Sequence, residues 1–120
     1  MDKEMKLGIL NDALVVKFIG DVDCLVCSLY KTKLETVIEE NKYKKVIMDF
    51  SNVSFIDSSG LGLILGRYNQ LKKRNGFLYM TGVNKQIEKI FNIAGIWTIM
   101  NKYDNVEEAL KVTGASRWIK

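Results

Sequence analysis

The sequence predicts an α/β fold: a single domain with a mixed, mostly parallel sheet of four or five strands, an antiparallel strand from an N-terminal hairpin, and about four helices. Two observations predict it. Apolar runs with high β-propensity alternate with stretches of helical periodicity, as in parallel strands joined by right-handed crossover helices. The 120-residue chain also lacks repeats, low-complexity segments and linkers, so we expect one hydrophobic core.

The first half of the chain is predicted to form a hairpin, a helix and a central strand. The runs "KEMKLGIL" and "ALVVKFIG" are separated by Asn11 and Asp12, a pair suited to a tight turn. From Asp23 to about Asn41, apolar residues recur at mostly helical spacing. The run "KKVIMDFS" (44–51) is typical of a strand that is covered on both faces.

The second half continues the alternation of helices and strands. The predicted elements are a helix over 58–74 ending near Asn75 and Gly76, a strand over 77–82, a helix over 84–95 between Asn84 and Gly95, a short strand over 98–100, and a last helix capped by Asp104. We expect the domain to span residues 1–113. A basic tail, Gly114–Lys120, follows it, and we assign that tail no function.

Composition limits the chemistry that is open to the chain. It contains no histidine, which removes the commonest general base and metal ligand and excludes Ser-His-Asp and Cys-His catalysis. We therefore expect no enzyme activity, no metal and no other cofactor. The net charge of +4 includes basic clusters at 42–45 and 71–74, but neither cluster has interleaved aromatic residues or a recognisable reading helix. Direct nucleic-acid binding is therefore not expected.

The apolar runs are too short to cross a membrane. None approaches the roughly 18 residues that a span requires. The opening segment "MDKEMKLGILND" is charged and does not resemble a secretory signal. We expect a cytoplasmic protein that does not act at a membrane.

The stretch "FIDSSGLGLIL" (55–65) stands at a predicted helix start. The Asp57 carboxylate can accept hydrogen bonds from the backbone N–H groups of Ser59 or Gly60, so the simplest interpretation is a well-capped helix. The glycines need a further reason. Gly60, Gly62 and Gly66 together destabilise a helix by about 2–3 kcal/mol relative to alanine.

The helical wheel divides this helix into two sides. Leu61, Ile64, Leu65, Tyr68 and Leu71 share the side that we expect to pack on the sheet. The other side carries Ser59, Gly62, Leu63, Gly66 and Gln70, with Ser58 at its flank. Small residues around an outward-pointing leucine favour close approach by the backbone of another protein. The alternative is that another element of the same chain covers this side.

Ser58 is predicted to lie at a helix N-terminus, just beyond the carboxyl end of a central strand. Sites in open α/β sheets concentrate at this edge, and the positive end of a helix dipole favours an anion. A phosphate on Ser58 would be tolerated there. It would place about −1.5 to −2 charges beside Asp57, so that binding could be switched off without unfolding.

These residues resemble the STAS domain, and more closely the bacterial anti-sigma factor antagonists. The resemblance runs from "VKFIGDVD" through "KKVIMDFSNVSFIDSSGLGLILGRYNQLKKRNG" to "NKQIEKIFNIAGIW" and "DNVEEAL", about residues 7 to 111. The segment "DSSGLGLILGRY" is most similar to antagonists of the sporulation sigma-F switch. A circuit of general stress or another regulatory circuit remains the alternative.

The resemblance implies a switch between partners. In such a switch, a partner anti-sigma factor with serine kinase activity phosphorylates Ser58, and a PP2C-type phosphatase restores the active form. The unphosphorylated form binds the anti-sigma factor and thereby frees a sigma factor. The resemblance also implies that Asp23 of the "GDVD" loop lies near Ser58 in the docking surface, whereas the family commonly has Glu where this chain has Asp21. The predicted partner-binding residues are Asp21, Asp23, Asp57, Ser58, Ser59, Gly60, Gly62, Leu63 and Gly66.

Two features of the sequence suggest other functional classes. Cys24 and Cys27 form a C-x-x-C motif at a helix start, as in thioredoxin-like oxidoreductases, but the chain lacks the opposing proline of those folds. Two reduced thiols, with Cys27 partly buried, are the simpler interpretation. The glycines and helix start also suggest a nucleotide-binding module, although neither a P-loop nor a GxGxxG motif is present.

Overall fold

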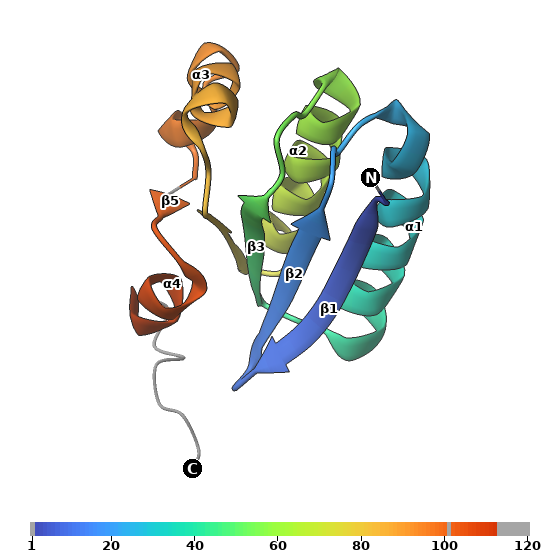
Figure 1. The fold of residues 1–120 in the computed structure, drawn as a ribbon. Coiled ribbons are helices and arrows are strands. Elements are labelled where there is room, and N and C mark those ends of the chain that lie inside the picture. The colour runs from blue at the N-terminus through green and yellow to red at the C-terminus, as the bar shows by residue number, and fades with distance from the viewer. Residues whose placement is uncertain (1, 101, 113–120) are drawn as a thin grey trace.

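The computed structural model of the chain describes residues 2–100 and 102–112. Within them the strands are β1 (Glu4–Leu10), β2 (Ala13–Ile19), β3 (Lys45–Asn52), β4 (Phe77–Thr81) and β5 (Lys102–Tyr103). The helices are α1 (Cys24–Asn41), α2 (Ser58–Lys72), α3 (Lys85–Ile93) and α4 (Val106–Val112), with a 3-10 turn η1 (Ile96–Thr98). The strands form one sheet in chain order, with an antiparallel β1–β2 pair and otherwise parallel pairs (Figure 1). The predicted fold class is confirmed.

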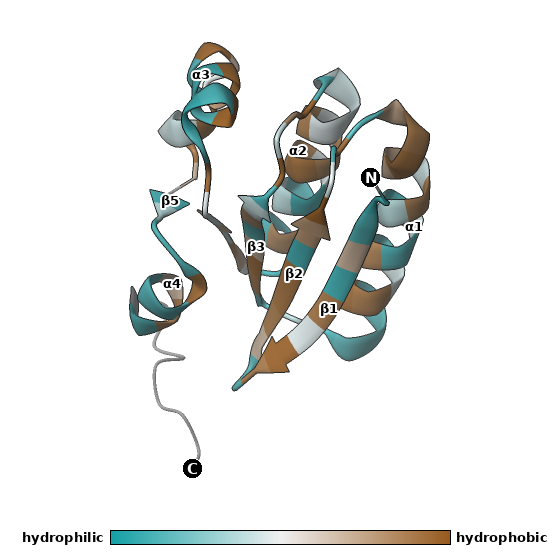
Figure 2. Ribbon diagram, in the orientation of Figure 1, coloured by the Kyte–Doolittle hydropathy of each residue, from teal (hydrophilic) through white to brown (hydrophobic). Residues whose placement is uncertain are grey.

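The sheet is covered on both faces. Helices α1 and α2 lie together on one side, and α4 lies on the other (Figure 1). The larger core cluster contains the stacked pair Phe18 and Phe50, with ring centroids 5.2 Å apart, and Phe91 of α3 meets Phe50 edge-on. A smaller cluster joins Ile47 to Leu110 of α4. Burial of β2 and β3 between these layers explains their apolar sequences, and Figure 2 shows β1 alternating between hydrophobic and hydrophilic residues at the edge.

The strand predicted over 98–100 is wrong. Gly95 adopts a left-handed conformation with φ of 72°, and the chain then turns as η1 with Ile96 buried. The Thr98 hydroxyl donates to the Gly95 carbonyl oxygen (2.6 Å), and the Met100 N–H donates to that of Ile96 (3.0 Å). These local bonds keep the backbone turned, and pairing with β4 begins only at β5.

The start of α4 also differs from the prediction by one residue. The side chain of Asn105, rather than that of Asp104, accepts a hydrogen bond from the Glu108 N–H (2.9 Å) and so acts as the N-cap. The predicted domain end at 113 and the tail 114–120 lie outside the described residues.

Candidate functional site

Two loops at the carboxyl edge of the sheet lie side by side. After β2 and β3, Val22 and Ile56 form a parallel bridge between the loops. The Val22 N–H donates to the Phe55 carbonyl oxygen (3.1 Å), and the Gly20 N–H donates to that of Asn52 (3.0 Å). Because each loop leads directly into a helix, the starts of α1 and α2 come together (Figure 1).

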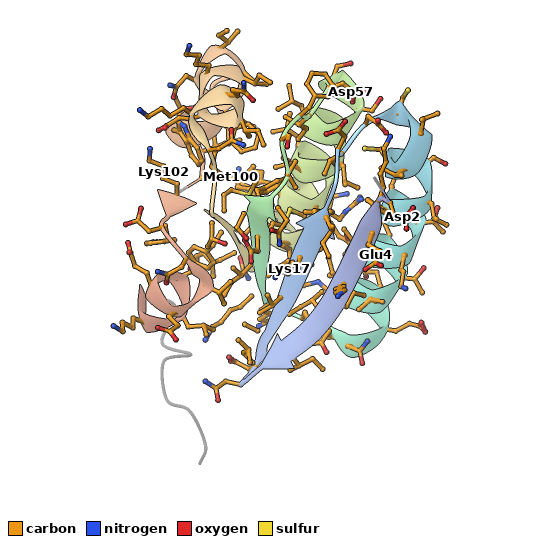
Figure 3. All side chains as sticks on the ribbon, viewed as in Figure 1. Asp2, Glu4, Lys17, Asp57, Met100 and Lys102 are labelled. Atoms are coloured by element: carbon orange, nitrogen blue, oxygen red, sulfur yellow. The ribbon has the colours of Figure 1, made fainter. Side chains whose placement is uncertain are left out.

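The Asp57 carboxylate joins these two helix starts. Its Oδ1 accepts from the backbone N–H groups of Ser59 (2.8 Å) and Gly60 (3.1 Å), which confirms the predicted cap of α2. Its Oδ2 accepts from the N–H of Cys24, the first residue of α1 (3.0 Å). Figure 3 labels Asp57 where α2 begins. Local capping rules do not predict the bond to Cys24, because its partners are 33 residues apart.

Asp23 is the N-cap of α1 and also forms an ion pair. Its Oδ1 accepts from the Leu25 N–H (3.1 Å), and its Oδ2 lies 2.5 Å from the Lys3 ammonium. The hydrogen bond from Lys3, together with that from Leu25, holds the pKa of Asp23 below its ordinary value. Asp21 is half-buried in the same loop. Three carboxylates, those of Asp21, Asp23 and Asp57, therefore belong to the two loops that precede these helices.

The serines differ in their exposure. Ser58 is the first residue of α2 and is exposed, whereas Ser59 is half-buried. The N–H groups of the first turn are capped by Asp57, so the cap does not depend on the Ser58 side chain. Ser58 therefore stands at the surface of a helix start that is already stabilised.

The predicted docking side of α2 needs two corrections. Leu63 does not point outward, because its side chain is only 3% exposed and belongs to the large core cluster. Gly60 is buried as well. A Cβ on Gly60 would lie 2.2 Å from Ile56 Cγ1 and 2.6 Å from the Val22 carbonyl oxygen, so this glycine allows α2 to approach the preceding loops. Neither residue offers a side chain to a partner.

The other two glycines of α2 face open space. A Cβ on Gly62 or Gly66 would meet no atom within 4 Å. Both lie along a hollow of about 390 Å³ between α1 and α2, which Cys24, Ser28, Lys31 and Arg67 also line. The structure thus leaves this part of α2 uncovered by the described residues.

The side of α2 that was predicted to pack on the sheet does so. Ile64 and Leu71 are fully buried, and Leu61, Leu65 and Tyr68 pack partly buried against the same cluster.

The two cysteines have different surroundings. Cys24 is exposed, whereas Cys27 is buried. Burial, reinforced by the nearby Asp57 and Asp23 carboxylates, raises the pKa of the Cys27 thiol to about 11. A thiol in this state is protonated at neutral pH and is a poor nucleophile.

The described residues contain no group of three or more histidine, cysteine, aspartate or glutamate side chains arranged to hold a metal ion. Among these residues, no helix has the length and apolar character that crossing a membrane requires.

Comparison with known sequences identifies relatives along most of the chain. The model of the STAS domain family matches residues 4–109. The chain is 27% identical over 110 residues to an anti-sigma F factor antagonist of Paenibacillus polymyxa, covering 92% of this chain and 94% of that protein. It is 30% identical over 97 residues to an anti-sigma-B factor antagonist of Staphylococcus epidermidis, covering 81% of this chain and 89% of that protein.

Solved structures show the same fold. The phosphorylated form of the Bacillus cell fate determinant SpoIIAA superposes with a TM-score of 0.75 at 26% identity, covering 92% of this chain and 99% of that chain. An anti-sigma factor antagonist from Mycobacterium paratuberculosis superposes with a TM-score of 0.83 at 18% identity, covering 92% and 93% of the two chains.

Proposed function

This chain belongs to the STAS domain family, and we propose that it is an anti-sigma factor antagonist whose binding surface is switched by phosphorylation of Ser58. The unphosphorylated protein binds an anti-sigma factor that is also a serine kinase, and so releases a sigma factor in the cytoplasm. A PP2C-type phosphatase reverses the modification. The protein acts by binding, without catalysis and without a cofactor.

The observation that carries the proposal is the position of Ser58. It is exposed at the first residue of α2, directly after Asp57, and the loop with Asp21 and Asp23 lies alongside. Phosphorylation adds about −1.5 to −2 charges to a surface that already contains these carboxylates. A partner that docks on the unmodified surface would meet a concentrated negative charge once Ser58 is phosphorylated, and it would lose close contact.

The local structure supports a switch that leaves the fold intact. Asp57, and not Ser58, accepts the hydrogen bonds of the first turn of α2. The phosphate would extend from an exposed residue without displacing a core side chain. The modification therefore changes the surface charge while the packing beneath it is retained.

The relatives support the same class of function. Two of them are named antagonists of anti-sigma factors, one of anti-sigma F and one of anti-sigma-B. The structure of SpoIIAA in a phosphorylated form shows that a protein of this fold carries the modification. We propose the sporulation sigma-F circuit for this chain, with a general-stress circuit as the alternative.

The proposal is tested with two Ser58 variants and the anti-sigma factor of the native host. We expect Ser58→Ala to bind the anti-sigma factor permanently, also in the presence of ATP, and Ser58→Glu to bind much more weakly in a pull-down. Ser59→Ala is the matched control, and phosphopeptide mapping after incubation with kinase and ATP shows which serine is modified. Equal binding by the Ala and Glu variants of Ser58 would contradict the switch.

A further inference from the structure

The groove between α1 and α2 has two unlike halves. Toward the ends of the helices, side chains join them: Arg74 lies 2.6 Å from a Glu39 carboxylate oxygen, and the Gln70 amide donates to Glu39 (2.9 Å) and to the Glu35 carbonyl oxygen (3.1 Å). Toward the helix starts, small residues line the hollow described above. That half is open beside Ser59, the neighbour of the proposed phosphorylation site.

The glycines of the open half have no role in the internal packing that the structure describes. Gly60 is required by its neighbours, but Gly62 and Gly66 have free space where a side chain would stand. Glycine disfavours a helix relative to alanine. Two such residues on the exposed side of one helix are therefore consistent with close approach from outside the domain.

Arg67 supplies an independent indication of what approaches. Its side chain is only 4% exposed, and it lines the hollow. Its Nη2 lies 3.4 Å from a Glu35 carboxylate oxygen, while Nε and Nη1 have no hydrogen-bond partner among the described residues. A guanidinium stays charged in proteins, and buried donors without acceptors are unfavourable. A negative charge placed in the hollow would therefore lie close to a guanidinium that a single carboxylate pairs within the domain.

Lys31 adds a second positive charge to the same hollow, from the α1 side. It is exposed on α1, and no acidic group of the described residues lies within ion-pair distance of it. The surface therefore has two ends of different charge: carboxylates where the helices begin, and farther along a net positive charge, from Lys31 and Arg67 beside the single carboxylate of Glu35. A protein partner that covers both ends is held in one orientation by this charge pattern.

We propose that the hollow between α1 and α2 receives a carboxylate side chain of the protein partner, bound by Lys31 and Arg67 while the partner backbone lies on Gly62 and Gly66. A carboxylate fits because the exposed Lys31 ammonium can pair with it directly, while the guanidinium charge of Arg67 lies on the other side of the hollow. The inference rests on the proposed function, since the partner is the anti-sigma factor that docks over Ser58.

The first test reverses the exposed charge. Lys31→Glu is compared with Lys33→Glu, a matched reversal about 200° around the same helix, by titration calorimetry against the anti-sigma factor of the native host. We expect Lys31→Glu to weaken binding about tenfold or more, and Lys33→Glu to bind like the unmodified protein. Equal affinities for both variants would overturn the proposal.

A second test examines Arg67 and the partner. Arg67→Met removes the buried donors, and circular dichroism reports whether the variant is folded; weaker binding by the folded variant is expected. If it does not fold, a charge exchange decides: an Asp→Lys or Glu→Lys replacement in the partner should restore the binding that Lys31→Glu loses. Failure of every such acidic-to-Lys replacement would overturn the inference, as would an Arg67→Met variant that folds and binds normally.

The outcomes also separate this inference from the proposed function. If the unmodified protein does not bind the anti-sigma factor, the proposed function fails. If it binds and responds to Ser58→Glu but not to Lys31→Glu, only the carboxylate site fails. A third measurement titrates the protein alone with ATP. Micromolar binding that Lys31→Glu abolishes would overturn the carboxylate site and would identify the hollow as a nucleotide site instead.

Discussion

At the scale of single residues, Asp57 has the widest structural effect in the site. Its carboxylate accepts hydrogen bonds from three backbone N–H groups, two in α2 and one in α1, and thus fixes both helix starts around Ser58. The α2 cap was predictable from the order Asp-Ser-Ser-Gly. The bond to Cys24 was not, because it depends on how the two loops pair.

Removing this carboxylate should destabilise the fold. We expect Asp57→Ala to lower the free energy of unfolding by about 1–2 kcal/mol, the usual range for loss of an N-cap. Asp57→Asn keeps one acceptor oxygen, so its free energy of unfolding should lie between those of the unmodified protein and Asp57→Ala. Urea denaturation of the three proteins measures the differences, with Asp104→Ala as a control because Asp104 is exposed and does not cap α4. An Asp57→Ala variant as stable as the control would show that the three bonds contribute nothing.

Asp23 gives a prediction for the effect of pH. The hydrogen bond from Lys3 lowers the pKa of Asp23 from 3.8, so this pair stabilises the folded state above about pH 4, and the contribution is lost as the pH falls through the folded-state value. Lys3→Met removes the bond. Its Tm should be lower than that of the unmodified protein at pH 7, and the difference should shrink by pH 3. A difference in Tm that is constant across this range would contradict the assigned cause.

At the scale of elements, α2 shows what a helical wheel cannot reveal. The apolar side of Leu61, Ile64 and Leu71 was predictable, because its periodicity is independent of the neighbours of the helix. Leu63 was placed on the wrong side because α2 packs against α1 as well as against the sheet, so a second face is also buried. The prediction of a strand over 98–100 was wrong for a related reason: a short apolar segment forms a strand only where its backbone can reach a partner strand.

The glycines of α2 should separate into two classes when replaced. We expect Gly60→Ala to destabilise the protein by about 1–3 kcal/mol, because the added Cβ overlaps Ile56 and the Val22 carbonyl. Gly62→Ala and Gly66→Ala should each stabilise it by about 0.5–1 kcal/mol, because the added methyl groups meet nothing. Thermal denaturation distinguishes these signs. Destabilisation by all three replacements would mean that the whole stripe is packed within the domain.

At the scale of the whole molecule, the core and the site are separate. The hydrophobic clusters lie on the two faces of the sheet, and the proposed switch lies at one edge, on exposed atoms between two capped helix starts. The alternation of strands and helices made this architecture predictable from the sequence. The open half of the α1–α2 groove was not predictable, because it arises from side chains of two helices that only the folded chain brings together.

The central claim is that negative charge on Ser58 blocks a protein partner without unfolding the domain. It is tested most directly by phosphorylating the protein on Ser58, confirming the position by mass spectrometry, and titrating both forms against the anti-sigma factor in a calorimeter. We expect the phosphorylated form to bind more than about tenfold more weakly, with a Tm close to that of the unmodified protein. Equal affinity of the two forms, or weaker binding that accompanies loss of the folded state, would contradict the claim.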